Sequence, residues 1–168
     1  GDSHTVVMLV TSFGTHDGTR QWLLNFGQKG FGAHIWCWTG ENEITFGSWG
    51  GHRSQLASTM DCRRQVLATV YDGHFYKLYI AGQFVGKSVA RFSIEDNTVA
   101  IGQSALIEGD FSGTIEEVRI FRRALFPSQI SALTKTLLAE DLSDLVLSEK
   151  GAYWRQAYQL CTCQCCSR

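Results

Sequence analysis

The feature that most constrains how this chain can fold is an Asp-Gly pair, Asp72-Gly73, which lies between two segments of β-forming residues. Residues 66–71 before the pair and 75–81 after it are rich in β-branched and aromatic types. An Asp-Gly pair favours the positive φ of a tight hairpin turn, so the two segments are expected to pair as antiparallel strands. A second turn at Ala81-Gly82 leads into residues 84–92, and two hairpins in series predict a meander.

Other segments show residue patterns that are typical of strands. Residues 6–10 and 22–26 are apolar runs, and residues 33–38 and 44–49 alternate between apolar and polar types. These patterns predict four more strands. After Pro127 the spacing changes, because Ile130, Leu133 and Leu137 recur at helical intervals. We therefore expect a helix that begins near Pro127, a favourable residue for the first helical turn.

Several short motifs occur in a fixed order and carry a family resemblance. They are Tyr71-Asp72-Gly73, Lys77-Leu78-Tyr79 with Gly82, Ile101-Gly102, Gly113-Thr114-Ile115-Glu116-Glu117-Val118-Arg119-Ile120-Phe121, and Arg123-Ala124-Leu125. In this order they resemble the third type of laminin-G-like domain, within the concanavalin A-like jelly-roll superfamily, and they are similar to the pentraxins. Two positions depart from the family pattern: Cys62-Arg63-Arg64 where a Trp is usual, and Ala81 where an Asp is common.

The resemblance implies an all-β fold, a two-sheet antiparallel jelly-roll sandwich with a C-terminal helical extension. We expect residues 1–133 to form the laminin-G-like sandwich and residues 134–168 to form a helical extension with a Cys-rich tail. A chain of 168 residues is long enough to bury one such core. The start of the chain lacks the basic and apolar regions of a signal peptide, so we expect a piece of a larger protein.

Charge and composition exclude two kinds of partner. The formal net charge is -1 and no run of Lys or Arg occurs, so nucleic acid is not an expected ligand. No window approaches the roughly 18 apolar residues that a membrane-spanning helix needs. Membrane association is expected only through the parent protein or through acylation of the Cys tail.

Catalysis is not expected. Sugar-cleaving relatives of the jelly roll carry carboxylates at alternate strand positions, as in E-x-D-x-E, and this chain has no such string. Glu116 and Glu117 are adjacent, so on a strand they are expected to point to opposite faces. No nucleophile elbow, phosphate-binding loop or zinc-protease motif occurs. The domain itself is predicted to be non-catalytic, while its parent protein can be an enzyme such as a cysteine protease.

Calcium is a possible but disfavoured cofactor. Many relatives bind it through several acidic and carbonyl oxygens in one rim loop. The loop that follows Ile101-Gly102-Gln103 begins Ser104-Ala105-Leu106-Ile107 and supplies only Glu108 and Asp110. We therefore expect no cofactor.

Five residues are candidates for ligand binding: Trp36, Trp38, Trp49, His52 and Arg53. Trp36 and Trp38 are two residues apart and share a strand face, and the other three follow the next predicted strand. Aromatic faces stack on sugars and anchor protein interfaces, but paired Trp residues also fill sandwich cores. The core role is favoured for the pair, and the ligand role is kept as the alternative.

The cysteines leave the cellular compartment open. Four of the six lie at the end, as Cys161, Cys163, Cys165 and Cys166, where pairing within the tail would be strained. Disulfides to other chains, half of a zinc site and acylation all remain open. A cytoplasmic part of a larger, membrane-anchored protein is slightly favoured over an extracellular setting.

Two functions therefore stand. The main hypothesis is a non-catalytic interaction or regulatory module of a larger multidomain protein, as in plant membrane-anchored calpains, with neighbouring domains or other proteins as partners. The alternative is an extracellular carbohydrate-binding or adhesion domain.

Overall fold

The computed structural model describes residues 3–13, 21–26, 33–40, 43–49, 55–59, 63–92, 99–102 and 111–139. At positions 26, 33–40, 43, 48, 49 and 55–59 only the backbone is described. The elements are β1 (His4–Ser12), β2 (Gln21–Phe26), β3 (Ala33–Gly40), β4 (Glu43–Trp49), β5 (Gln55–Thr59), β6 (Arg64–Tyr71), β7 (Phe75–Ile80), β8 (Gln83–Val89), β9 (Val99–Ile101), β10 (Gly113–Phe121) and α1 (Pro127–Ala139).

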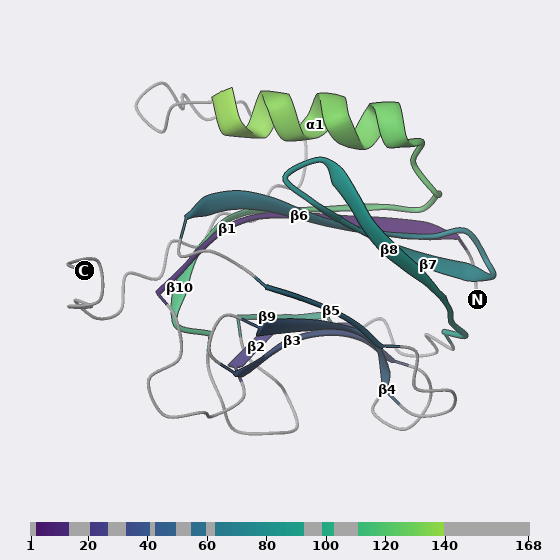
Figure 1. The fold of residues 1–168 in the computed structure, drawn as a ribbon, viewed down its shortest axis with the longest axis horizontal. Coiled ribbons are helices and arrows are strands. Elements are labelled where there is room, and N and C mark those ends of the chain that lie inside the picture. Colours follow the sequence, from purple (N-terminus) through teal and green to yellow (C-terminus); the bar gives the residue numbers. More distant parts are fainter. Residues whose placement is uncertain are drawn as a thin grey trace.

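The strands form two antiparallel sheets that face each other (Figure 1). Sheet A has the order β10-β1-β6-β7-β8, and sheet B has the order β5-β4-β3-β2-β9. This confirms the predicted all-β jelly-roll sandwich with a C-terminal helix. The strands expected from alternation are all present, within a few residues at their ends. Strand β5 was not expected, because its sequence Gln-Leu-Ala-Ser-Thr has little of the β-branched and aromatic content that marks the others.

The central strands of sheet A are buried on both faces. Nearly every residue of β1 and β6 is buried, so these strands read as continuous apolar runs rather than as alternating patterns. One set of their side chains, including Met8 and Leu67, joins Ile44 and Phe46 of sheet B in the core between the sheets. The other set, which includes Val7 and Val66, requires a second cover.

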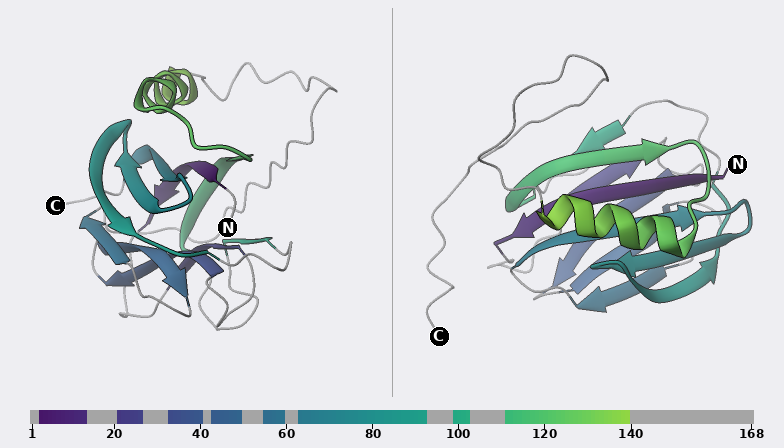
Figure 2. Two further views of the ribbon diagram at one scale, coloured as in Figure 1. Left: turned by 90° about the vertical axis from the view of Figure 1, so that its right-hand side faces the viewer. Right: turned by 90° about the horizontal axis from the view of Figure 1, so that it is seen from above.

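Helix α1 supplies that cover. It lies over β1 and β6 on the side of sheet A away from sheet B (Figures 1 and 2). Ile130 and Leu137 pack in one cluster with the outward-facing residues of β1, β6 and β7. The helix therefore passes without a break through the expected boundary between residues 133 and 134. Residues 140–168, with the Cys tail, lie outside the described residues.

Both ends of α1 are fixed by polar contacts. At the start, the Phe126 N–H donates to Oε1 of Gln129 at 3.0 Å, which is half of a capping box. Pro127 occupies the first helical position, as the sequence predicts. At the end, Arg64 donates to the carbonyl of Leu138 at 3.2 Å. This guanidinium satisfies one of the terminal carbonyls that the helix itself leaves unpaired.

The two predicted turns are confirmed. Gly73 has φ 99°, and the carboxylate of Asp72 accepts hydrogen bonds from the backbone N–H groups of His74 and Phe75. At the second turn Ala81 and Gly82 both have positive φ, 49° and 77°. A Cβ at Gly82 would lie 3.3 Å from the Thr134 side chain, so the helix and this turn approach closely.

The expectation for Glu116 and Glu117 is wrong, because a β-bulge interrupts the alternation. Leu9 pairs with Glu117 and Val10 with Ile115, which leaves Glu116 without a register partner. Glu117 lies opposite Leu9, on the helix side, and forms an ion pair with Arg119. The Glu116 carboxylate accepts a hydrogen bond from Arg64 at 2.9 Å, and Arg64 also binds the end of α1. Both carboxylates therefore lie on the side of sheet A that faces the helix.

One buried hydroxyl connects the first strand to the approach of the helix. Thr5 is fully buried; its hydroxyl donates to the Arg123 carbonyl at 2.8 Å and accepts from the Leu125 N–H at 3.0 Å. We predict that Thr5→Val, which keeps the shape, lowers the free energy of unfolding by about 2 kcal/mol because the Leu125 N–H loses its partner. Urea unfolding measures this. A loss below about 0.5 kcal/mol, the range of ordinary surface changes, would show that the hydroxyl is dispensable.

The first turn predicts a pH dependence. Burial alone would raise the pKa of Asp72, but the Lys77 ammonium and the N–H groups of Phe75 and His74 lower that pKa from 3.8 to about 2. A depressed folded-state pKa stabilises the fold above about pH 4, and this contribution is lost as the pH falls toward 2. We expect Asp72→Asn to lower stability by about 1 kcal/mol at neutral pH, allowing for solvent screening. The difference from wild type should vanish between pH 4 and 2, and a difference that is constant with pH would contradict the charge-based cause.

Candidate functional site

The outer face of sheet B is the broad face on which no described helix lies. Figure 1 shows α1 on the far side of sheet A, while sheet B presents its second face away from the core. The register divides sheet B into rows of residues that share one face. One row that includes Phe46 and Leu24 belongs to the core. The two rows beside it therefore belong to the outer face.

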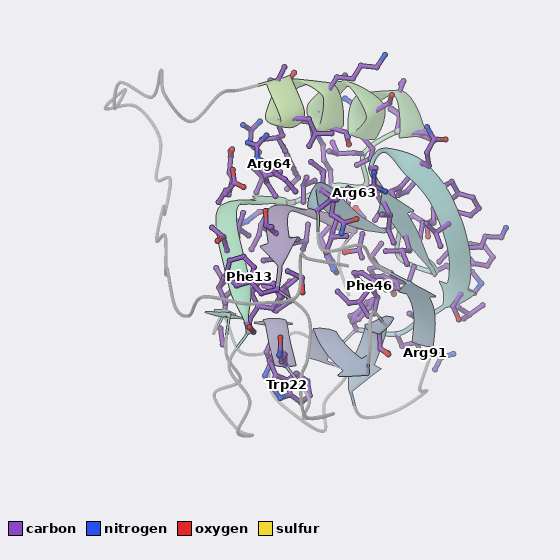
Figure 3. All side chains as sticks on the ribbon, turned by 60° about the vertical axis from the view of Figure 1, so that its left-hand side comes forward. Phe13, Trp22, Phe46, Arg63, Arg64 and Arg91 are labelled. Carbon is purple, nitrogen blue, oxygen red and sulfur yellow. The ribbon has the colours of Figure 1, made fainter. Side chains whose placement is uncertain are left out.

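A β-bulge in β2 places Trp22 and Asn25, two side chains with hydrogen-bonding groups, on this outer face. Trp22 pairs with Cys37 and Leu24 pairs with Trp36, so Leu23 is the extra residue. Leu23 and Leu24 both enter the core, whereas Trp22 belongs to neither described core cluster. In Figure 3 Trp22 lies on the side of sheet B away from sheet A, and Phe46 lies between the sheets. Without the bulge, Trp22 and Asn25 would face opposite sides; with it, they share one.

The outer rows combine these residues with small ones. The first row contains Trp22, Cys37, Thr45 and Ala57, and the second contains Ala100, Asn25, Ile35, Gly47 and Gln55. Across β3 and β4, the positions that lie in these rows are therefore mostly occupied by residues with short side chains, such as Cys37, Thr45 and Gly47. The backbone position of Trp49, paired with Ala33, follows in the next outer row. Backbone register therefore places Trp22 and Trp49 on the same face of sheet B, two rows apart.

Asn25 is the chemically unusual member of this face. It is 8% exposed, and its side-chain carbonyl oxygen is buried with no hydrogen-bond partner among the described residues. Buried polar atoms in native proteins nearly always have a partner, so an exception calls for a cause such as an absent ligand or water. Trp22 is 1% exposed and Thr45 7%. Other parts of the molecule therefore cover the indole and the hydroxyl, and the Asn25 amide is the polar group on this face that can accept a further hydrogen bond.

The five residues predicted from sequence are divided by the fold. Trp36 and Trp38 lie on β3 at positions paired with Phe46 and Ile44, both fully buried in the core, whereas Trp49 is in an outer row. His52 and Arg53 lie outside the described residues. A ligand role for all five stays a prediction. Sequence reasoning missed Trp22 and Asn25, because a strict two-residue period places them on different faces.

The described residues offer no cluster of three or more His, Cys, Asp or Glu side chains that could hold a metal ion. The loop after Gly102, on which the calcium expectation rests, lies outside the described residues. None of the described helices is long and apolar enough to cross a membrane.

The family follows from a match over most of the chain. The family model described as the concanavalin A-like lectin/glucanases superfamily matches residues 1–131. The chain belongs to this superfamily. No curated protein sequence matches it. The closer likeness to pentraxins and to plant calpains stays a prediction.

Solved structures share the superfamily fold. The CBM40 domain of the Ruminococcus gnavus IT-sialidase bound to α2,3 sialyllactose has 16% identity and a TM-score of 0.62, over 79% of this chain and 83% of that one. The receptor-binding domain of botulinum neurotoxin D has 13% identity and a TM-score of 0.64, over 83% and 38%. A putative carbohydrate-binding protein from Bacteroides ovatus has 20% identity and a TM-score of 0.61, over 77% and 40%. At these identities the likeness establishes the fold alone.

The unpartnered amide predicts an unusual stability effect. We expect Asn25→Leu to raise the free energy of unfolding by about 1 kcal/mol, because it removes a buried oxygen that has no partner. Gln21→Leu is the matched control on the same strand, because the Gln21 Oε1 accepts the Ser112 N–H at 2.9 Å. That variant should lose stability. If both variants lose stability equally in thermal or urea unfolding, the Asn25 oxygen is not an orphan.

Proposed function

We propose that the domain is a non-catalytic carbohydrate-binding module and that the outer face of sheet B contacts the sugar. The observation that carries this proposal is the buried, unpartnered carbonyl of Asn25 beside the outward-facing Trp22. A sugar hydroxyl would supply the missing donor to the Asn25 oxygen. The Trp22 indole is 1% exposed, so it would stack on the sugar only after the part of the molecule that covers it moves aside.

The fold supports the same choice. The superfamily description names both lectins and glucanases, which act on carbohydrates in different ways, and two of the solved neighbours are described as carbohydrate-binding proteins or domains. Glu116 and Glu117, the only adjacent carboxylates on a described strand, are each held by an arginine on the helix side of sheet A. Both carboxylates are thus engaged in ion pairs, which favours binding over hydrolysis.

The test is a glycan array with neutral and sialylated sugars, read with and without calcium. We expect binding to a subset of glycans, and the same subset in EDTA. For the best glycan, Asn25→Leu should weaken binding at least tenfold, which corresponds to about 1.4 kcal/mol.

Gln83→Leu is the control for this experiment, because it also replaces a side-chain amide with Leu, on the exposed strand β8 of the other sheet. It should bind as the wild type does. A folded protein that binds no glycan in either condition would refute the proposal. Equal affinity of the Asn25→Leu variant would retain sugar binding but move it away from this face.

A further inference from the structure

The edge strand β8 exposes an unusual set of side chains. Among the described residues β8 is the last strand of sheet A, with β7 as its neighbour in the sheet. Phe84, Val85 and Val89 on it are 55%, 42% and 49% exposed. Soluble proteins usually protect such edges with short strands, bulges or charged residues. Strand β8 carries a bulge at Val85 and one lysine, Lys87, but residues 86–89 keep a regular register, so its exposed apolar residues still need an explanation.

The register shows that some backbone groups on this edge point away from β7. The Ala90 N–H donates to the His74 carbonyl at 3.1 Å, which makes this a hydrogen-bonded pair. Hydrogen-bonded and non-hydrogen-bonded pairs alternate along an antiparallel ladder. The pairs Phe75 with Val89 and Lys77 with Lys87 are therefore of the second kind. The backbone N–H and C=O groups of Lys87 and Val89 therefore point away from β7, and the Val89 carbonyl accepts a long hydrogen bond of 3.5 Å from the Ser88 hydroxyl.

The charge on this edge is unbalanced. Lys77 and Lys87 lie directly opposite each other, and like charges in such a pair destabilise a sheet. Lys77 is neutralised by Asp72, with its Nζ 2.7 Å from the Asp72 carboxylate. Lys87 has no carboxylate partner among the described residues, and its ammonium sits 4.6 Å from the centre of the Phe75 ring. One uncompensated cation thus lies between exposed apolar side chains.

We infer that β8 is a docking edge for an extended, acidic segment of a partner protein, which would add a strand to sheet A. Backbone groups at Lys87 and Val89 would pair with the incoming strand. An acidic residue of that strand would face Lys87, and an apolar residue two positions away would cover Val89. This edge belongs to sheet A, whereas the proposed sugar-binding face belongs to sheet B, although β8 contacts the edge strand β5 of that sheet.

The same lysine argues against a second copy of the chain. Two β8 edges that paired with each other would bring Lys87 and its neighbour Lys77 close to the same charges of the partner copy, and edge lysines are known to discourage such pairing. An acidic strand would be attracted by the positive charge of Lys87, whereas the lysines of a second copy would be repelled by it. Charge complementarity therefore selects the occupant.

The test uses fluorescence anisotropy with the full chain and two labelled nine-residue peptides that alternate Val and Thr. One peptide carries a central Glu and the other a central Lys. We expect the Glu peptide to bind at least tenfold more tightly, with an affinity that falls at high salt. Lys87→Glu should reverse this preference. Lys135→Glu, the same change on an exposed residue of α1, should leave it unchanged.

Each other outcome overturns the inference. Equal binding of the two peptides, or a preference that Lys87→Glu does not alter, would show that Lys87 does not select the partner. N-methylation of every second peptide residue removes the N–H groups on one edge of the peptide and so blocks strand pairing through that edge. If a peptide methylated on its odd residues and one methylated on its even residues both still bind, an added strand is excluded. Self-association that blocks the peptide would assign the edge to a second copy. Binding that appears only after residues 140–168 are removed would assign the edge to this chain's own C-terminal segment, which carries Glu140, Asp141, Asp144 and Glu149.

Discussion

The central constraint on this structure is that β1 and β6 are apolar on both faces. A sheet with one wet face would leave residues such as Val7 and Val66 in water, so sheet A must be covered twice. Sheet B covers one side and α1 covers the other. The hydroxyl of Thr5, the cap at Gln129 and the guanidinium of Arg64 hold the helix in that position. Because α1 belongs to sheet A, the outer face of sheet B is left without a described helix.

Local sequence signals predicted most of the fold. The Asp72-Gly73 turn, the alternating strands and the start of α1 at Pro127 all depend on short-range chemistry, and all three are confirmed. Strand β5 was not predicted, because its pairing with β4, rather than its own residue types, makes it a strand. Tertiary context overrides weak local preference at such edges.

The candidate site was less predictable, for a physical reason. Which face a strand residue occupies depends on every bulge before it, and a bulge is a property of the pairing rather than of one strand. The extra residue Leu23 places Trp22 and Asn25 on one face, and the extra residue Glu116 turns a carboxylate toward α1. Trp36 and Trp38 drew attention by their residue type, but no sequence rule shows whether alternate Trp positions face a core or a ligand. The proposed sugar face and the proposed docking edge lie on different sheets.

The link between Thr5 and Leu125 also determines when the domain can become complete during synthesis. These two residues are separated by 120 positions, and Leu137, which helps close the outer cluster, comes later still. As the chain leaves the ribosome, sheet A can assemble only after β10 emerges, and its outer apolar surface stays open until α1 follows. The nascent domain therefore passes through a stage with an exposed apolar sheet, the kind of surface that aggregates or recruits chaperones. A chain that ends before α1 would remain in that state.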